Sequence, residues 1–136
     1  AFHSCQQVEY INLEGVKSIG TGAFQSNASV KTVTITGVEG SPLKIGKEAF
    51  ANCAELKSVS LPAQTTEIGA SAFNFCRQLA SLRIAATEPP KVFRTTFPSK
   101  VAGANRVLYV PKGSKAKYEA VAFWKDKFSS IEETDF

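Results

Sequence analysis

The sequence predicts an α/β solenoid, a fold in which short repeats stack side by side around one shared core. The segment IGKEAFANCAELKSVSLP at residues 45–62 recurs at residues 68–84 as IGASAFNFCRQLASLRI. An earlier, weaker copy begins at Ile19, and in all three copies an Ala-Phe pair stands at +4 and +5 from the first isoleucine. Aliphatic residues follow at +11, +14 and +16. Repeats of this length each complete their core only by stacking on their neighbours.

The spacing of the Ala-Phe pairs defines about four and a half repeats. Their phenylalanines are 22, 26, 23 and 24 residues apart, counting a degraded pair at Thr96 and Phe97. The 26-residue step contains TGVEGSPLK at residues 36–44, which reads as a surface loop insertion. The chain starts within a repeat, at the Ala-Phe pair, so the first unit is expected to be truncated.

Each repeat is expected to contain one strand and one returning segment. The strand takes the LxxVxL part, in which Val59 and Leu61 alternate inward with period 2. Equivalent strands are reached by equivalent crossovers and must be parallel. The IG..AF part returns along the other side, with tight turns at Gly46 and Gly69 and one helical turn over residues 47–52. The repeated phenylalanines then form a stacked apolar ladder.

The C-terminal part departs from the repeat and is predicted to close the stack. A TEPP segment at residues 87–90 interrupts the pattern, and a longer strand follows at residues 107–110. Ser114 is a plausible N-cap for a helix over residues 115–122, and Trp124 is expected to pack rather than bind a ligand. The acidic end, Glu132, Glu133 and Asp135, reads as a solvated tail. The predicted division is a solenoid over residues 1–111 and a capping segment of the same domain over residues 112–136.

The three cysteines occupy the same slot of the repeat, three residues after the phenylalanine. Cys5, Cys53 and Cys76 contain no CxxC pair, so no zinc site is expected. Neighbouring strands lie about 4.8 Å apart, which leaves a Cys53–Cys76 disulfide open by distance. Parallel side-chain directions disfavour that bond, and we expect buried free thiols.

Composition and motifs exclude several classes of function. The net charge is +4, and the lysines near the C-terminus are mixed with acidic residues, which favours a solvated surface over nucleic-acid binding. No apolar run approaches the roughly 20 residues that a membrane helix needs. His3 is the only histidine, and no catalytic, metal or cofactor motif is present. We therefore expect no enzyme activity, no cofactor, no metal and no membrane insertion.

The motif IGxxAFxxCxxLxSVxLP resembles the BspA-type leucine-rich repeat, also called the Treponema pallidum type. The segment LYVPKGSKAKYEAVAFWKD at residues 108–126 is similar to the closing part of such proteins in Bacteroidetes. The resemblance implies a leucine-rich repeat solenoid with parallel strands on its concave face. It also implies a secreted or surface-anchored protein that adheres to host proteins, other bacteria or matrix.

Residues between the inward positions of each strand are expected to project from the concave face. Such a row of hydroxyls, with tyrosines at its ends and one arginine, could bind a protein or a glycan. The row is also what an exposed sheet face commonly carries without any binding role, because threonine favours strands, and this structural interpretation is the one we favour. The candidate binding residues are Tyr10, Asn12, Thr32, Thr34, Ser58, Ser60, Ser81, Arg83 and Tyr109.

The function predicted first is a non-enzymatic recognition or adhesion module outside the cell. Tyr10, Arg83 and Tyr109 are expected to contribute most to binding. The alternative is a structural spacer, or a segment that self-associates through its open N-terminal end.

Overall fold

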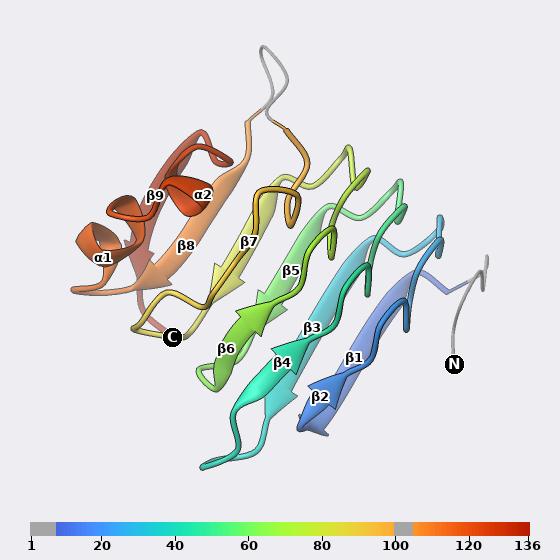
Figure 1. Ribbon diagram of the computed structural model, residues 1–136, viewed down its shortest axis with the longest axis horizontal. Helices are drawn as coiled ribbons and strands as arrows, with labels where there is room; N and C mark the ends of the chain where they lie inside the picture. Colours follow the sequence, from blue (N-terminus) through green and yellow to red (C-terminus); the bar gives the residue numbers. More distant parts are fainter. Residues whose placement is uncertain (1–7, 100–104) are drawn as a thin grey trace.

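Equivalent strands of successive repeats pair side by side, so the chain winds through two parallel sheets (Figure 1). A computed structural model describes residues 8–99 and 105–136. The larger sheet has the strand order β1-β3-β5-β7-β8-β9, and the smaller has the order β2-β4-β6. The predicted parallel solenoid is confirmed. The strands are β1 Tyr10–Val16, β2 Ser18–Ile19, β3 Thr32–Gly37, β4 Leu43–Ile45, β5 Ser58–Leu61, β6 Thr65–Ile68, β7 Ser81–Ile84, β8 Val107–Pro111 and β9 Ser130–Thr134.

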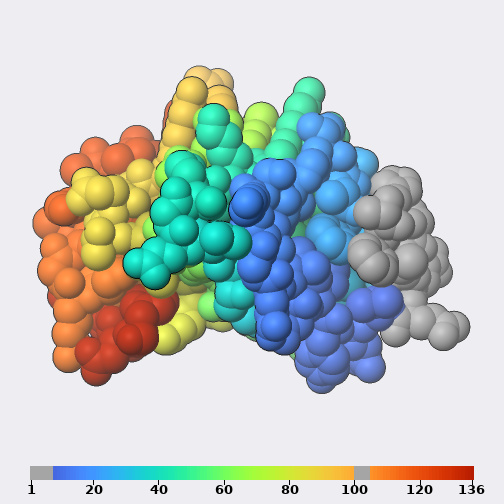
Figure 2. Space-filling model, turned by 90° about the horizontal axis from the view of Figure 1, so that it is seen from below, coloured from blue at the N-terminus to red at the C-terminus, as the bar shows by residue number. Residues whose placement is uncertain are grey.

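The core lies between the two sheets and runs the length of the stack. We call one turn of the solenoid, which corresponds to one repeat, a coil. Val33 pairs with Val59, and Val59 pairs with Leu82, so an aliphatic residue fills the same inward position in each of these coils. All three are buried, whereas their neighbours along each strand are partly exposed. Figure 2 shows the coils following one another along the molecule, from blue near the N-terminus to orange and red.

The returning half of each repeat is extended and then turns, and the predicted helical turn at residues 47–52 is wrong. Glu48 and Asn52 have φ angles of 58° and 61°, which no right-handed helix contains. Their amides donate to carbonyls of the next coil, at Ala70 (3.0 Å) and Asn74 (2.9 Å). The backbone of this segment is thus satisfied between coils, and the smaller sheet continues the same pairing at β2, β4 and β6.

Glycine follows the isoleucine in these repeats because the coils approach closely there. A Cβ atom on Gly69 would lie 2.6 Å from the Lys47 nitrogen, and one on Gly46 would lie 2.7 Å from the Gly20 carbonyl carbon. Real Cβ atoms do not approach backbone atoms that closely. The reason for these glycines is contact between coils rather than the tight turn that the sequence suggested.

The predicted phenylalanine ladder is confirmed. The rings of Phe24, Phe50, Phe73 and Phe97 follow one another with centroids 5.3, 5.3 and 5.7 Å apart and planes within 5° of parallel. Offset stacking at this separation is the favoured geometry for aromatic pairs. Each coil therefore presents to the next one the same apolar surface that it covers on the coil before it.

The cysteine slot provides hydrogen-bond donors as well as packing. The Cys53 Sγ donates to the Phe24 carbonyl at 3.4 Å, and the Cys76 Sγ donates to the Phe50 carbonyl at 3.1 Å. Both thiols are free and buried, as predicted, while Cys5 lies outside the described residues. In the copy that has asparagine here, the Asn27 Nδ2 reaches the Phe24 carbonyl at 2.6 Å. The slot accepts a small residue that can donate to a buried carbonyl.

The C-terminal segment closes the stack with aromatic side chains. Helix α1 spans Lys115–Glu119 and helix α2 spans Ala122–Lys125, so the helix predicted over residues 115–122 is shorter and is followed by a second turn. Trp124 is buried against Phe97, and its Nε1 donates to the Pro90 carbonyl at 3.0 Å. Its predicted packing role is confirmed.

The acidic residues Glu132, Glu133 and Asp135 are exposed, as predicted, but Glu132 and Glu133 belong to a strand rather than to an unstructured tail. Strand β9 pairs with β8 in parallel and extends the larger sheet. The Glu133 Oε2 accepts hydrogen bonds from the amides of Gly113 (2.8 Å) and Lys115 (3.1 Å), at the start of α1. Ser114 makes no side-chain cap; its Oγ donates to the Pro111 carbonyl at 2.6 Å. A carboxylate therefore takes the capping role that the sequence assigned to a serine.

The entry to β8 is held by a buried arginine that no sequence motif singles out. Arg106 is 3% exposed, and its guanidinium donates to the carbonyls of Leu79 (3.1 Å), Pro98 (2.7 Å) and Lys127 (2.9 Å). Burial lowers the pKa of Arg106. These bonds join the fourth repeat to the capping segment.

Candidate functional site

The outward side chains of the larger sheet form two rows that run across the strands. Parallel pairing in constant register aligns equivalent positions, so each row takes one residue from each strand. The first row is Tyr10, Thr32, Ser58, Ser81, Val107 and Ser130. The second row is Asn12, Thr34, Ser60, Arg83, Tyr109 and Glu132.

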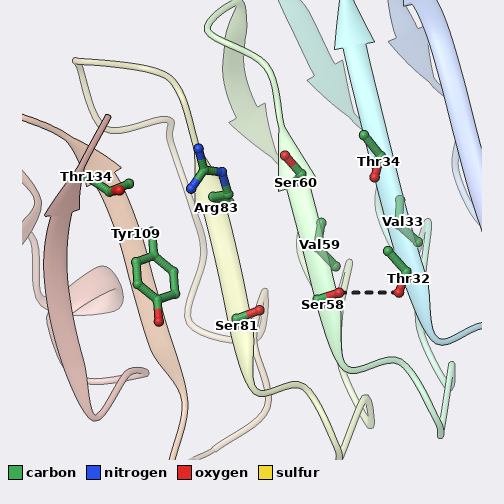
Figure 3. Close-up of a pocket in the computed structure, with 10 residues that line it drawn as sticks. All are labelled: Thr32, Val33, Thr34, Ser58, Val59, Ser60, Ser81, Arg83, Tyr109 and Thr134. Carbon is green, nitrogen blue, oxygen red and sulfur yellow. Dashed lines mark hydrogen bonds between the residues drawn. The ribbon is translucent and has the colours of Figure 1, made fainter. Parts of the chain in front are cut away.

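A shallow hollow of about 270 Å³ lies over the middle of these rows (Figure 3). It is open to solvent, and the side chains that line it are mostly hydroxyls from β3, β5 and β7. Seven of the nine predicted binding residues meet there, and all seven are partly exposed. They are Thr32, Thr34, Ser58, Ser60, Ser81, Arg83 and Tyr109.

The other two predicted residues lie apart, on β1. Tyr10 is 71% exposed, and both Tyr10 and Asn12 border a separate cavity of about 200 Å³ near Ile11 and Phe24. The structure therefore divides the predicted set into a central group around the hollow and a pair at the β1 edge.

The hollow is polar and presents its hydroxyls at the regular spacing of the strands. The Ser58 Oγ donates to the Thr32 Oγ1 at 3.4 Å, a long bond within the first row. Arg83 supplies a positive charge between Ser60 and Tyr109, its partners in the register. The arrangement offers donors and acceptors to an approaching surface, with one guanidinium and one aromatic ring at the β8 side.

Three residues that were not among the predicted binding residues, Thr134, Asp135 and Phe136, complete this site. Arg83 Nη2 donates to the Asp135 carbonyl at 3.0 Å, and the Phe136 ring lies 4.3 Å from the guanidinium carbon. Thr134 borders the hollow as well. No sequence signal could have found these contacts, because they join positions more than 50 residues apart through a strand that the repeat does not predict.

A second cation–aromatic pair lies away from the hollow, on the turn between β6 and β7. The Arg77 guanidinium carbon is 5.8 Å from the Phe75 ring centroid, and Phe75 is 49% exposed. Phe75 has a φ angle of 63°, where the equivalent positions carry Ser26 and Asn52. The same two residue types thus occur at a second surface, which makes them a useful control for the hollow.

The site contains no arrangement that points to covalent or metal chemistry. Within residues 8–99 and 105–136, no three His, Cys, Asp or Glu side chains gather closely enough to hold a metal ion. A hydrogen bond with Cys53 and burial raise the pKa of the Cys76 thiol, which keeps it protonated near neutral pH. In the same part of the chain, no helix has the length and apolar character needed to cross a membrane.

Comparison with known proteins identifies the repeat. The sequence pattern described as the BspA type Leucine rich repeat region matches residues 1–97 in six copies. This match covers more than half of the chain and includes every residue of the ladder. Among curated proteins, none is similar enough to serve as a relative. Modules of this repeat type have protein-interaction or structural roles.

Proposed function

The chain belongs to the BspA-type leucine-rich repeat family, and we propose that it is a non-enzymatic recognition module of a secreted or cell-surface protein. It binds a protein or glycan partner through the outward face of the larger sheet, and it contributes to adhesion. The family resemblance supports both the extracellular location and the adhesive role.

The observation that carries the proposal is the hollow itself. Seven predicted side chains meet over four adjacent strands, on a face whose other side is fixed by the packed core. A rigid surface that displays polar groups loses little conformational entropy when it binds. Aromatic and arginine residues contribute most to binding at such surfaces, and here Arg83 and Tyr109 supply them.

A panel of purified extracellular-matrix proteins and a glycan array tests this proposal. The unaltered chain is compared with the double variant Arg83→Ala, Tyr109→Ala. We expect the double variant to lose at least about tenfold in affinity, since hot-spot residues each contribute more than about 1.4 kcal/mol. The melting temperature should stay nearly unchanged, because both side chains are partly exposed. Unchanged affinity would move the site elsewhere.

A second candidate function is a spacer or self-assembling segment that acts through the β1 edge. The cavity beside Tyr10 and Ile11 has an apolar lining, and the described residues place no strand on the outer side of β1. Edge strands of this kind can pair with another chain. Light scattering over a range of concentrations tests it: growth in mass that Tyr10→Lys suppresses supports self-assembly, whereas a constant monomer mass excludes it.

A further inference from the structure

Arg83 already holds a ligand-like group that comes from its own chain. One edge of its guanidinium donates to the Asp135 carbonyl, and one flat face lies against the Phe136 ring. A guanidinium can do both at once, because its donors lie in the plane and its face attracts an aromatic ring. Two successive residues therefore satisfy Arg83 with a backbone carbonyl and a ring.

These two residues reach Arg83 by crossing over β8. Thr134 ends β9 opposite Pro111, and β8 separates β9 from β7. Figures 1 and 2 both place the end of the chain beside the yellow segment that follows β7. Asp135 and Phe136 thus leave the sheet's own pairing and cover the Arg83 end of the hollow.

Asp135 and Phe136 are held over the hollow by weak, exposed contacts. Phe136 is 53% exposed. Asp135 forms an ion pair with Lys112 at 3.2 Å, in which the two side chains are 86% and 69% exposed. Exposed pairs of this kind contribute little and are screened by salt. An incoming group that makes the same contacts can therefore replace Asp135 and Phe136.

We propose that Asp135 and Phe136 occupy the place of a partner residue, and that the hollow takes protein partners with an aromatic side chain on an extended segment. This inference rests on the proposed function and names its partner class. The aromatic ring of the partner replaces Phe136 on Arg83, and its backbone carbonyl replaces that of Asp135.

The groups that Arg83 contacts are a neutral carbonyl and a ring, not a carboxylate. The ion pairs of the described chain join Glu9 with Lys31, Glu88 with Lys117 and Asp135 with Lys112, and none involves Arg83. The partner proposed here offers the same two groups. The hydroxyls of Ser81, Ser60 and Ser58 continue from the guanidinium across β7 and β5, where they can bond the backbone of an extended segment.

The test uses the capped peptide acetyl-Thr-Asp-Phe-amide as its probe. It is titrated into nitrogen-15-labelled protein, as the unaltered chain and as the variant Phe136→Ala. We expect saturable shifts around Arg83 in the variant, with binding at least about threefold tighter than in the unaltered chain. The tethered Phe136 competes there at an effective concentration in the millimolar range. Equal affinity for the two proteins, or no saturable shift, would overturn the inference.

Two controls separate recognition of the ring from general attraction. The peptide acetyl-Thr-Asp-Leu-amide should bind the Phe136→Ala variant more weakly than the phenylalanine peptide. A further change, Arg83→Lys, should remove that preference, because an ammonium group has no flat face to stack. Equal binding of both peptides to the Phe136→Ala variant would contradict the proposed partner class.

The outcome is distinguishable from failure of the proposed function. A matrix protein or glycan that requires Arg83 and Tyr109, yet does not compete with the phenylalanine peptide, would overturn this inference and leave the proposed function standing. If no member of the panel loses affinity when these residues are changed, while the peptide binds as described, the proposed function fails. The binding of an aromatic ring and a carbonyl by Arg83 would still stand.

Discussion

The repeats and the capping segment both bury aromatic rings, but they orient them differently. In the repeats, the planes of successive phenylalanines lie within 5° of parallel. In the cap, Trp124 and Phe128 lie within 20° of each other, but both are rotated against the last ladder ring, Phe97, by 50° and 69°, and Tyr118 meets Trp124 at 77°. A parallel stack presents an identical surface to the next coil, whereas rotated rings do not. Ring orientation thus distinguishes the part that can be extended from the part that ends it.

The aromatic side chains of the cap also donate hydrogen bonds to the chain before it, which the phenylalanine rings of the ladder cannot do. The Trp124 Nε1 donates to the Pro90 carbonyl, and the Tyr118 hydroxyl donates to the Ala86 carbonyl at 2.7 Å. Pro90 ends the segment where the repeat pattern breaks, and Ala86 directly precedes that segment. The prolines there interrupt the coil, and the cap's two polar aromatics satisfy carbonyls that the interruption leaves near the core.

Removing a ring from the middle of the ladder should have the largest effect. Phe50 is buried and stacks on both sides, so Phe50→Ala should lower the free energy of unfolding by about 3–5 kcal/mol. Urea unfolding followed by circular dichroism measures this. Melting identical to the unaltered chain would show that the stack does not stabilise the repeats.

The second-largest loss of stability is expected where neighbouring coils approach each other closely. Gly69→Ala places a Cβ atom 2.6 Å from the Lys47 nitrogen and should destabilise the protein by about 1–3 kcal/mol, as overpacking does. Gly20→Ala is the matched control, because no described atom other than those of Gly20 and its two chain neighbours lies within 4 Å of its Cβ position. Equal melting temperatures for the two variants would contradict the packing explanation.

In the cap, Tyr118→Phe should cost about 1 kcal/mol through loss of one buried hydrogen bond. Burial, followed by the charge of Glu88, raises the pKa of Tyr118 above its usual 10.0. Its contribution to stability is therefore full below about pH 10 and lost as the pH rises further. The variant should lose less stability than the unaltered chain between neutral pH and pH 11, as measured by thermal melting. An identical loss in both proteins would show that ionisation of Tyr118 does not lower the stability at high pH.

The smallest effect is expected at the start of α1. Glu133→Ala removes the acceptor for two backbone amides and should cost about 0.5–1 kcal/mol, in the range of helix caps. Glu132→Ala, on the adjacent exposed position of β9, is the control and should be nearly neutral. Equal melting of the two variants would assign Glu133 no capping role.

The sequence predicted the repeats well because their period records the stacking. Phe50, Cys53 and Val59 recur at fixed offsets only if each coil buries them alike, so strand direction, ladder and free thiols all follow from spacing. The same spacing placed seven candidate binding residues around one hollow. The period carries no information on backbone conformation, which is why the turns at Glu48 and Asn52 were mistaken for a helix.

The cap was harder to predict because it has no repeat. Pairing of β9 depends on an edge that β8 leaves open, and residues 130–134 show no periodic apolar pattern that would reveal it. Capping by Glu133 and the contacts of Asp135 and Phe136 with Arg83 depend on that pairing. None of these contacts has a signature in the sequence, because each depends on β9 lying beside β8.

The central claim is that recognition takes place on the outward face of the larger sheet, and paired variants test it directly. Dissociation constants for one partner from the matrix panel are measured with two double variants. The first carries Arg83→Ala and Tyr109→Ala, and the matched control carries Phe75→Ala and Arg77→Ala. The control likewise removes one arginine and one aromatic residue, but from the turn between β6 and β7. We expect a loss of at least about tenfold in affinity for the first pair and under about twofold for the second. The reverse pattern would place recognition on the turns.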